Sequence, residues 1–332
     1  MTDRRPKGSE GAVPDDIRAL ADERALARAG KEWAVADALR ARIEAAGWRV
    51  VDRGFSYRLE PAHRPTVEVA GLVRYGRSAD VPSRLDLPPI GTATVVVVAT
   101  DWPDDVARTL ASLATTTPDG ASVVVVADGP TPEQDAALAA GSLPVVGGGP
   151  IEVVRTIERL GTGAAWTSGV RRAGGAVVVI LDPSVEATGD VVSPLIEALS
   201  DPSVGVAGGW GLVTEDLRRF REAPAGDVDA VEGYLLAFRR ADAVERGPID
   251  ERFRYYRNLD IWWSLVLRDE GEGRPARRAV AVDVPAVRHE HRGWTSLPEA
   301  ERDRLSKRNF YRVLDRFGGR LDLLTRRLSD GT

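Results

Sequence analysis

The segment TVVVVAT, Thr94–Thr100, decides the fold of this chain. It is a continuous β-branched run, which is typical of a strand buried on both faces of a parallel sheet. Two runs of the same type follow, SVVVVADG at Ser122–Gly129 and AVVVILD at Ala176–Asp182. Helical patterns lie between them, first PDDVARTLASLA and then GTGAAWTSGVRRAG. This alternation predicts an α/β sheet with helices on both faces.

Polar residues stand at the carboxyl end of each predicted strand. These ends carry Thr100–Asp101, Asp128–Gly129 and Asp182–Ser184. Ligands of open α/β sheets bind beyond the carboxyl ends of the strands. Asp and Gly are also common in turns, so any one of these ends is equally explained by turn chemistry. Three such ends in one sheet favour a binding site at this edge.

The composition is that of an ordinary globular protein, with 332 residues, 43% hydrophobic and 29% charged. That length suggests one large domain with a smaller appendage. Cysteine is absent, which excludes disulfides and thiolate metal sites and fits a cytoplasmic protein. The net charge of −5 argues against general nucleic-acid binding. No apolar run approaches the length of a membrane helix, and the start of the chain lacks a signal-peptide core.

The expected organisation has a small module in front of the main domain. Residues 1–14 are predicted to be a disordered tail, and residues 15–60 to form two helices and a β-hairpin. The second helix has apolar residues at helical spacing from Trp33 to Ile43 and Gly47 at its end; the hairpin turns at Gly54. A linker with a strand near Val67–Val73 follows at residues 61–92. The main domain is expected at residues 93–320, including a helix with a capping box from Ser296 to Glu299, and residues 321–332 form a tail.

The order of motifs from Thr94 to Phe317 resembles the family 2 glycosyltransferases, which have the Rossmann-like GT-A fold of nucleotide-diphospho-sugar transferases. The motifs are VVVVATDWPDDVARTLASL, VVVVADG, GTGAAWTSGVRRAGG, VVVILDPS, EGYLLAFRR, PIDERFRYYRNLD and RHEHRGW. The resemblance implies transfer of a sugar from a nucleotide-sugar donor, bound across the strand ends, to an acceptor.

The resemblance also implies roles for single residues. Asp182 would be the first acid of the Asp-x-Asp motif that holds Mg²⁺ or Mn²⁺, with Ser184 at the second ligand position. His289 or His291 would supply a late metal or phosphate ligand, and we expect only one of them to face the cleft. The donor would contact Thr100, Asp101, Asp128, Gly161, Gly163 and Thr167, and the acceptor side would include Glu232, Gly233, Trp262 and Trp263.

Several positions depart from the family pattern. Ser184 is neutral, so the metal is expected to bind weakly without the nucleotide diphosphate. The family's acidic pair reads Arg257–Asn258 here, and neither residue accepts a proton at neutral pH. Asp260 is the nearest remaining carboxylate, so the catalytic position is assigned to Asp260 together with Asn258. Asp260 is about equally well explained as a charge at the start of a helix.

Structural explanations stay open for other residues too. Asp182 is also suited to closing the turn after its strand. Adjacent helix residues point apart, so at least one of Trp262 and Trp263 is expected in the core or an interface.

The N-terminal module has a resemblance of its own. ERALARAGKEWAVADALRARIEAAGWRVVDRGFSYRL is similar to the carboxy-terminal anticodon-recognition segment of cysteinyl-tRNA synthetases. The catalytic parts of a synthetase are absent. Acids and bases nearly balance in the module, so strong phosphate binding is not expected. We expect it to dock on the α/β domain or on a partner protein, and we consider nucleic acid an unlikely ligand.

Three functions follow from these patterns. The first is a glycosyltransferase with an altered metal and base site. The second is a non-catalytic relative that binds a nucleotide sugar, a glycan or a partner protein, because acids are missing at positions 184, 257 and 258. The third is an RNA-associated protein, suggested by the N-terminal module alone. The sequence decides neither the sugar and the acceptor nor between inversion and retention.

Overall fold

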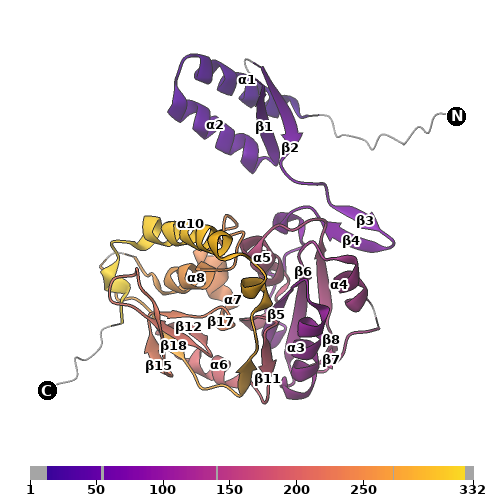
Figure 1. Cartoon of the computed structure of the whole chain (residues 1–332), viewed down its shortest axis with the longest axis vertical. Coiled ribbons are helices and arrows are strands. Elements are labelled where there is room, and N and C mark those ends of the chain that lie inside the picture. Colours follow the sequence, from indigo (N-terminus) through magenta and orange to yellow (C-terminus); the bar gives the residue numbers. More distant parts are fainter. Residues whose placement is uncertain (1–12, 54–55, 140, 272, 326–332) are drawn as a thin grey trace. The chain divides into compact units, whose positions relative to one another are not determined.

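The computed structural model describes residues 13–53, 56–139, 141–271 and 273–325. The chain divides into two compact units, with the boundary between Pro65 and Thr66 (Figure 1). Of the tail predicted at residues 1–14, residues 1–12 lie outside the described part of the chain. Within the described part of the chain, no helix is both long and apolar enough to cross a membrane.

The first unit has the two helices and the hairpin that the sequence predicts. Its elements are α1 (Asp15–Ala29), α2 (Trp33–Ala45), β1 (Trp48–Arg53) and β2 (Ser56–Pro61), with β1 and β2 antiparallel. Gly47 follows α2 with a φ of 83°, a conformation that glycine adopts without strain. Arg24, almost fully buried, pairs with Asp52 at 2.9 Å and joins α1 to β1. The predicted turn at Gly54 lies outside the described residues.

The second unit is built on one sheet, which has ten strands among the described residues, in the order β15-β18-β12-β17-β10-β5-β6-β9-β4-β3. The predicted valine runs form its parallel centre, β5 (Gly91–Ala99), β6 (Ala121–Ala127) and β10 (Gly175–Leu181). The antiparallel neighbour of β10 is β17 (Leu235–Arg239). The other strands of this sheet are β3 (Val67–Val69), β4 (Leu72–Tyr75), β9 (Glu152–Thr156), β12 (Val204–Gly208), β15 (Gly226–Val228) and β18 (Arg278–Ala281). Smaller sheets are formed by β7 (Val145–Val146) with β8 (Gly149–Pro150), by β11 (Val185–Ala187) with β19 (Ala286–Arg288), and by β13 (Gly211–Val213) with β14 (Arg221–Ala223) and β16 (Ala230–Val231).

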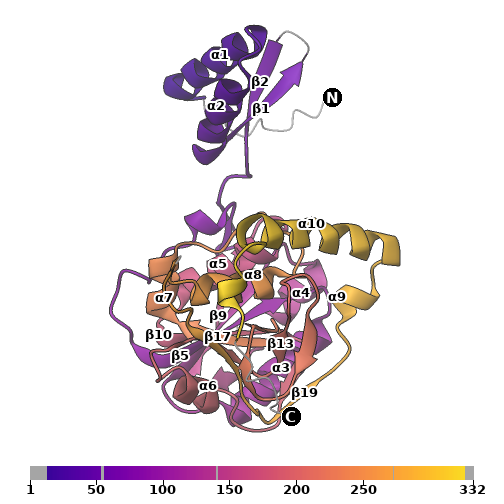
Figure 2. The same ribbon diagram turned by 90° about the vertical axis from the view of Figure 1, so that its left-hand side faces the viewer.

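Helices cover both faces of this sheet, as the buried strands predict (Figures 1 and 2). One face carries α5 (Thr162–Arg172), α7 (Arg240–Arg246), α8 (Leu259–Arg268) and α10 (Glu299–Phe317); the other carries α3 (Pro103–Thr116), α4 (Pro132–Ala137) and α6 (Ser193–Ala198). Val96 packs into the hydrophobic core on the face that carries α5 and α8, whereas Val95 and Val97 pack into the core on the face that carries α3 and α6. The period of two along a strand produces this division. Shorter elements are η1 (Ser78–Asp80), α9 (Arg292–Thr295) and η2 (Leu321–Leu323).

Three segments differ from the sequence-based expectation. The expected linker contains the β3–β4 hairpin, and β4 extends the sheet by pairing in parallel with β9. The expected tail begins with η2, in which Leu323 is buried. The predicted capping box is wrong, because Pro298 precedes α10 and no side chain caps it, while Ser296 ends α9 instead.

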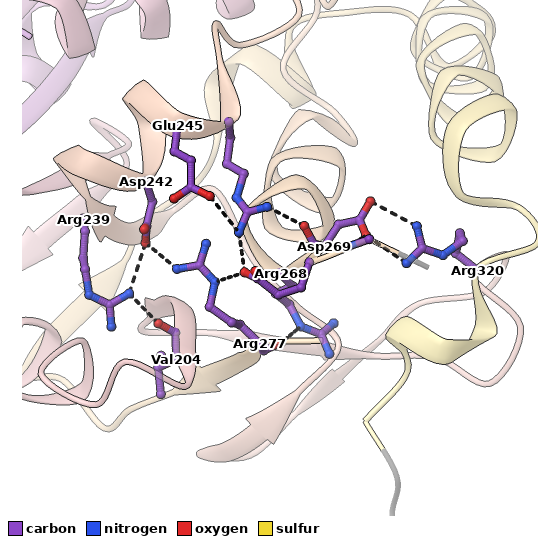
Figure 3. Close-up of polar contacts among 11 residues, drawn as sticks. Val204, Arg239, Asp242, Glu245, Arg268, Asp269, Arg277 and Arg320 are labelled. Atoms are coloured by element: carbon purple, nitrogen blue, oxygen red, sulfur yellow. Dashed lines mark hydrogen bonds and ion pairs between the residues drawn. The ribbon is translucent and has the colours of Figure 1, made fainter. Parts of the chain in front are cut away.

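Two arginines, Arg268 and Arg320, join the end of α8 to the C-terminal segment (Figure 3). Arg268 is 2% exposed, and its guanidinium donates to the backbone oxygens of Arg277, Asp229 and Leu323 at 2.8, 2.5 and 2.6 Å. Arg320 pairs at 2.8 Å with Asp269, the residue that follows Arg268 in the chain. One side chain therefore satisfies carbonyls from three segments that are distant in sequence.

Replacing Arg268 by Ala should lower the free energy of unfolding of the larger unit by about 3 kcal/mol or more, since buried carbonyls are left without donors. Chemical denaturation followed by circular dichroism measures this. Arg218→Ala, at an exposed arginine, is the control and should change the value by less than about 0.5 kcal/mol. Equal stabilities of the two variants would contradict the assigned role of Arg268.

Candidate active site

A cleft of about 340 Å³ opens at the carboxyl ends of β5, β6 and β10, the edge that the sequence predicts. This volume is typical of a small-molecule site. The strand ends line the cleft together with the connection before β17, which pairs with the end of β10 at the same edge of the sheet. The segment before α8 forms another part of the lining. Predicted site residues that the cleft brings together are Thr100, Asp101, Asp128, Gly161, Asp182, Glu232, Gly233, Asp260 and His291.

Asp128 shapes the cleft by holding the loop before α5. Its two carboxylate oxygens accept the backbone N–H groups of Leu160 and Gly161, each at 2.8 Å. Burial raises the pKa of Asp128 and outweighs these hydrogen bonds. Gly161 has a φ of 103°, and a Cβ there would lie 2.6 Å from the Cα of Arg254. The loop thus fits against the backbone of Arg254 only with glycine at this position.

Asp182 is the central acid at the tip of β10. Its Oδ1 accepts the backbone N–H of Ser184 at 2.8 Å and the Ser184 hydroxyl at 2.5 Å. Its Oδ2 lies 3.4 Å from His291 Nε2. Burial acts to raise the pKa of Asp182, but the contacts with His291 and Ser184 outweigh it and hold this pKa below its usual value. Ser184 therefore closes the turn and helps to keep Asp182 ionised.

The two histidines separate, as the sequence predicts. His289 lies outside the cleft, with Nε2 2.7 Å from Glu186 Oε2. His291 lines the cleft, stacks on Tyr256 at 4.4 Å, and caps α9 because its Nδ1 accepts the backbone N–H of Trp294 at 3.1 Å. A neutral imidazole carries one proton, so this cap places the proton on Nε2, which faces Asp182.

The side chains at this strand tip do not by themselves fit a divalent ion, which takes six or more oxygen ligands. Among the residues that the structure describes, no three His, Asp or Glu side chains are grouped so that one ion could contact them all. One Asp182 oxygen already accepts twice, and the His291 nitrogen beside the other oxygen carries a proton. Further ligands would have to come from a substrate.

Asn258 and Asp260, assigned to the catalytic position, lie in different surroundings. Asn258 precedes α8 with a φ of 67°, and its Nδ2 donates to the backbone oxygen of Ser306 at 3.1 Å. It is not among the cleft-lining residues. Asp260 lines the cleft, and burial raises its pKa despite two backbone hydrogen bonds.

The remaining predicted site residues lie outside the lining of the cleft. Gly163 and Thr167 are buried in α5, where the Thr167 hydroxyl donates to the Gly163 carbonyl at 2.9 Å. Trp262 and Trp263 are 5% and 0% exposed, so both belong to the core. Burial between sheet and helices accounts for all four positions, and their assigned contacts with donor or acceptor stay predictions.

Other cleft residues were not assigned from the sequence. They come mainly from the segment RFRYYRN at residues 252–258. Its three arginines and two tyrosines in seven residues were the sequence signal that could have indicated a binding site there. Arg257 lines the cleft, and its guanidinium carbon lies 5.2 Å from the ring centroid of Trp294. The additional lining residues of this kind are Trp166, Arg254, Tyr255 and Tyr256.

The sequence model described as Glycosyl transferase family 2 matches residues 94–260, just over half of the chain. The chain belongs to this family. The matched range contains the three central strands, Asp182 and Asp260, and it ends before His291. The matched range thus includes every cleft-lining residue except His291, Gly293, Ser296 and Leu297.

A solved structure described as GalNAc-T7 with UDP, GalNAc and Mn²⁺ shares the fold of this family 2 protein. The alignment covers 68% of this chain and 48% of that chain, with 18% identity and a TM-score of 0.53. This chain therefore spans about half the length of that structure. At this identity the likeness establishes the GT-A fold, as the motif order predicts.

The N-terminal segment has only short matches to curated proteins. A cysteine–tRNA ligase of Opitutus terrae is 46% identical over 59 residues, which are 18% of this chain and 13% of that protein. A second one, from Burkholderia lata, is 53% identical over 47 residues, 14% of this chain and 10% of that protein. The matches agree in part with the predicted resemblance and leave most of the ligase without a counterpart here.

Ser184→Asp should tighten Mn²⁺ binding by the nucleotide-free protein about tenfold or more, equivalent to about 1.4 kcal/mol. The reason is a second carboxylate at the strand tip, whereas the unmodified protein offers one. Isothermal titration measures the affinities, and Ser184→Ala, which adds no charge, is the control. Tight Mn²⁺ binding by the unmodified protein would contradict the poor fit described above.

Proposed function

We propose that this protein transfers a sugar from a nucleoside-diphosphate donor to an acceptor hydroxyl. The observation that supports this most strongly is the cleft itself. It lies at the carboxyl ends of the parallel strands of a family 2 domain and combines ionised Asp182 with the cations of Arg254 and Arg257. Anions and hydroxyl-rich ligands are suited to such a mixture of charges.

The donor would lie across the tips of β5, β6 and β10, as in other open α/β sheets. The loop held by Asp128 and the end of β5 at Thr100–Asp101 would surround the nucleoside. Arg257 would face the diphosphate and stabilise its charge as it leaves, while the Nε2–H of His291 faces Asp182 and orients it. Placing these groups on rigid elements orients the donor before reaction.

The solved relative with UDP and GalNAc also contains Mn²⁺. In this protein, we propose, a divalent cation enters only with the diphosphate, whose oxygens would supply the ligands that the side chains lack. Asp182 is the residue that would contact such an ion. When bound, the ion would neutralise charge on the leaving diphosphate.

A second candidate is a relative that binds a nucleotide sugar without transferring it. The loss of acids at positions 184, 257 and 258 supports this candidate. It differs from the first in one measurable property, because donor would bind but would not be consumed.

Nucleoside diphosphates or their sugars should raise the melting temperature of the protein. A ligand at 100 times its Kd stabilises the folded state by about 2.7 kcal/mol. A thermal-shift screen of uridine, guanosine and thymidine donors, with and without Mn²⁺, followed by isothermal titration, measures this. Any part of the affinity that depends on Mn²⁺ should be lost in Asp182→Ala. Absence of binding across the whole panel would overturn the proposed donor site.

We propose that the N-terminal unit is a protein-docking element and does not hold tRNA. Residues 15–60 contain nine acidic and nine basic side chains, so counterion release would favour binding to phosphates very little. In a gel shift at physiological salt, total tRNA should bind the full chain no more tightly than about 1 µM, the range of non-specific binding. Tighter, salt-sensitive binding that is lost when residues 1–60 are deleted would support the RNA-associated alternative.

A further inference from the structure

Glu232 is a cleft carboxylate in an unusual position. It lies in the connection between β16 and β17, where its backbone N–H donates to the carbonyl of Trp210 at 2.8 Å. Its side chain is 13% exposed and lines the cleft. It reaches the cleft from the connection that leads into β17, whereas the acidic pair missing at positions 257 and 258 belongs to the segment before α8.

One oxygen of Glu232 is held in place. Arg288 of β19 donates from Nη1 to Glu232 Oε2 at 2.8 Å. The Arg288 guanidinium itself lies over the rings of Trp210 and Tyr234, with centroid distances of 5.0 and 5.1 Å. Among the described residues, no hydrogen bond or ion pair engages the other oxygen, Oε1. The side chain is therefore oriented by one oxygen and has the second available to a substrate.

Asp260 is engaged differently. Its Oδ2 accepts the backbone N–H of Gly233 at 2.9 Å, and its Oδ1 accepts the N–H of Ile261 at 2.9 Å. Both oxygens thus bind backbone groups, and they fix the residue after Glu232 to the start of α8. This geometry suits a positioning residue, and it places a second negative charge close to Glu232.

The surroundings of Glu232 bring the pKa of its carboxyl group close to neutral pH. Burial, together with the negative charge of Asp260, raises the pKa of Glu232 to about 7, although the charge of Arg288 opposes this shift. Glu222 and Arg257 are the other charged groups that face it, and they act in opposite directions. An acid with a pKa near the working pH is suited to general base catalysis.

We propose that Glu232 is the catalytic base of an inverting glycosyl transfer, an inference that rests on the proposed function. Oε1 would accept the proton of the acceptor hydroxyl while that oxygen bonds to the anomeric carbon of the donor sugar. The bond from this carbon to the diphosphate oxygen breaks in the same displacement, and the diphosphate leaves with the electron pair. Glu232 then returns the proton to solvent. A carboxylate from the connection before β17 thereby replaces the acidic pair that is missing at positions 257 and 258.

The test compares Glu232→Gln with the matched control Glu222→Gln. Glu222 also approaches Arg288, at 3.4 Å, but is 68% exposed and outside the cleft lining. The donor that binds in the screen above is incubated with each full-length protein, with water as the acceptor, and release of nucleoside diphosphate is measured from pH 5.5 to 8.5. Proton NMR identifies the first-formed anomer of the sugar.

Glu232→Gln should keep nucleotide affinity within about threefold and lose about 10²- to 10⁴-fold in rate, the usual contribution of a general base. Glu222→Gln should stay within about threefold of wild type. The wild-type rate should rise with pH through about 7, where Glu232 ionises, and the released sugar should be inverted.

Other outcomes overturn the inference in distinguishable ways. Full activity in Glu232→Gln with loss in Asp260→Asn would assign the base to Asp260, and a retained anomer would exclude the inverting displacement. Bound donor without turnover in the wild type would leave the donor site intact but refute the base. Absence of donor binding would refute the proposed function itself.

A second readout is independent of turnover. Because the pKa of Glu232 is raised in the folded protein, its stabilising contribution is present at low pH and is lost as pH rises through about 7. The melting temperature of the wild type should therefore fall relative to that of Glu232→Gln between pH 5.5 and 8.5. Parallel curves would contradict the inference.

Discussion

The burial of β5, β6 and β10 on both faces is the constraint on which the rest of this structure depends. Valines on alternate sides of each strand need apolar partners, so helices must cover both faces of the sheet. Parallel strands joined by helices all end at the same edge. Their polar residues therefore gather there, and the cleft is a consequence of the way the core is filled.

Several carboxylates in the cleft also hold the backbone that forms it. Asp128 holds the loop before α5, and Asp260 joins the connection before β17 to the start of α8. Such hydrogen bonds satisfy backbone groups that would be costly to bury alone. They also place negative charge at fixed points, which alters the protonation of neighbouring acids. Support of the cleft wall and control of its electrostatics are thus properties of the same side chains.

Arginine has a corresponding role in this chain. Arg268 and Arg320 join α8 to the C-terminal segment. Arg288 lies over two aromatic rings and orients Glu232, and Arg257 lines the cleft. The planar guanidinium has five donors and stacks on rings, so it can contact several backbone oxygens or a carboxylate and an aromatic face together. Lysine offers neither geometry.

The sequence by itself determined the class of fold, the two small N-terminal helices with their hairpin, and the edge of the sheet at which polar residues meet. These features depend on local periodicity and on the order of elements, which a linear pattern contains. Residues two apart on a strand share a face, so alternation did not decide which of His289 and His291 would face the cleft. The structure separates them because β19 ends at Arg288, before both histidines.

Only the tertiary structure decided what each polar residue contacts. The bond from the Gly233 backbone to Asp260 Oδ2 and the approach of Arg288 to Glu232 join residues from different elements, whereas the pairing of Ser184 with Asp182 is local. The contacts of Asp260 and Glu232 connect segments 27 and 56 residues apart. Sequence patterns describe which side of an element a residue occupies; long-range packing determines which neighbour it meets, and with it the charge and proton affinity of the site.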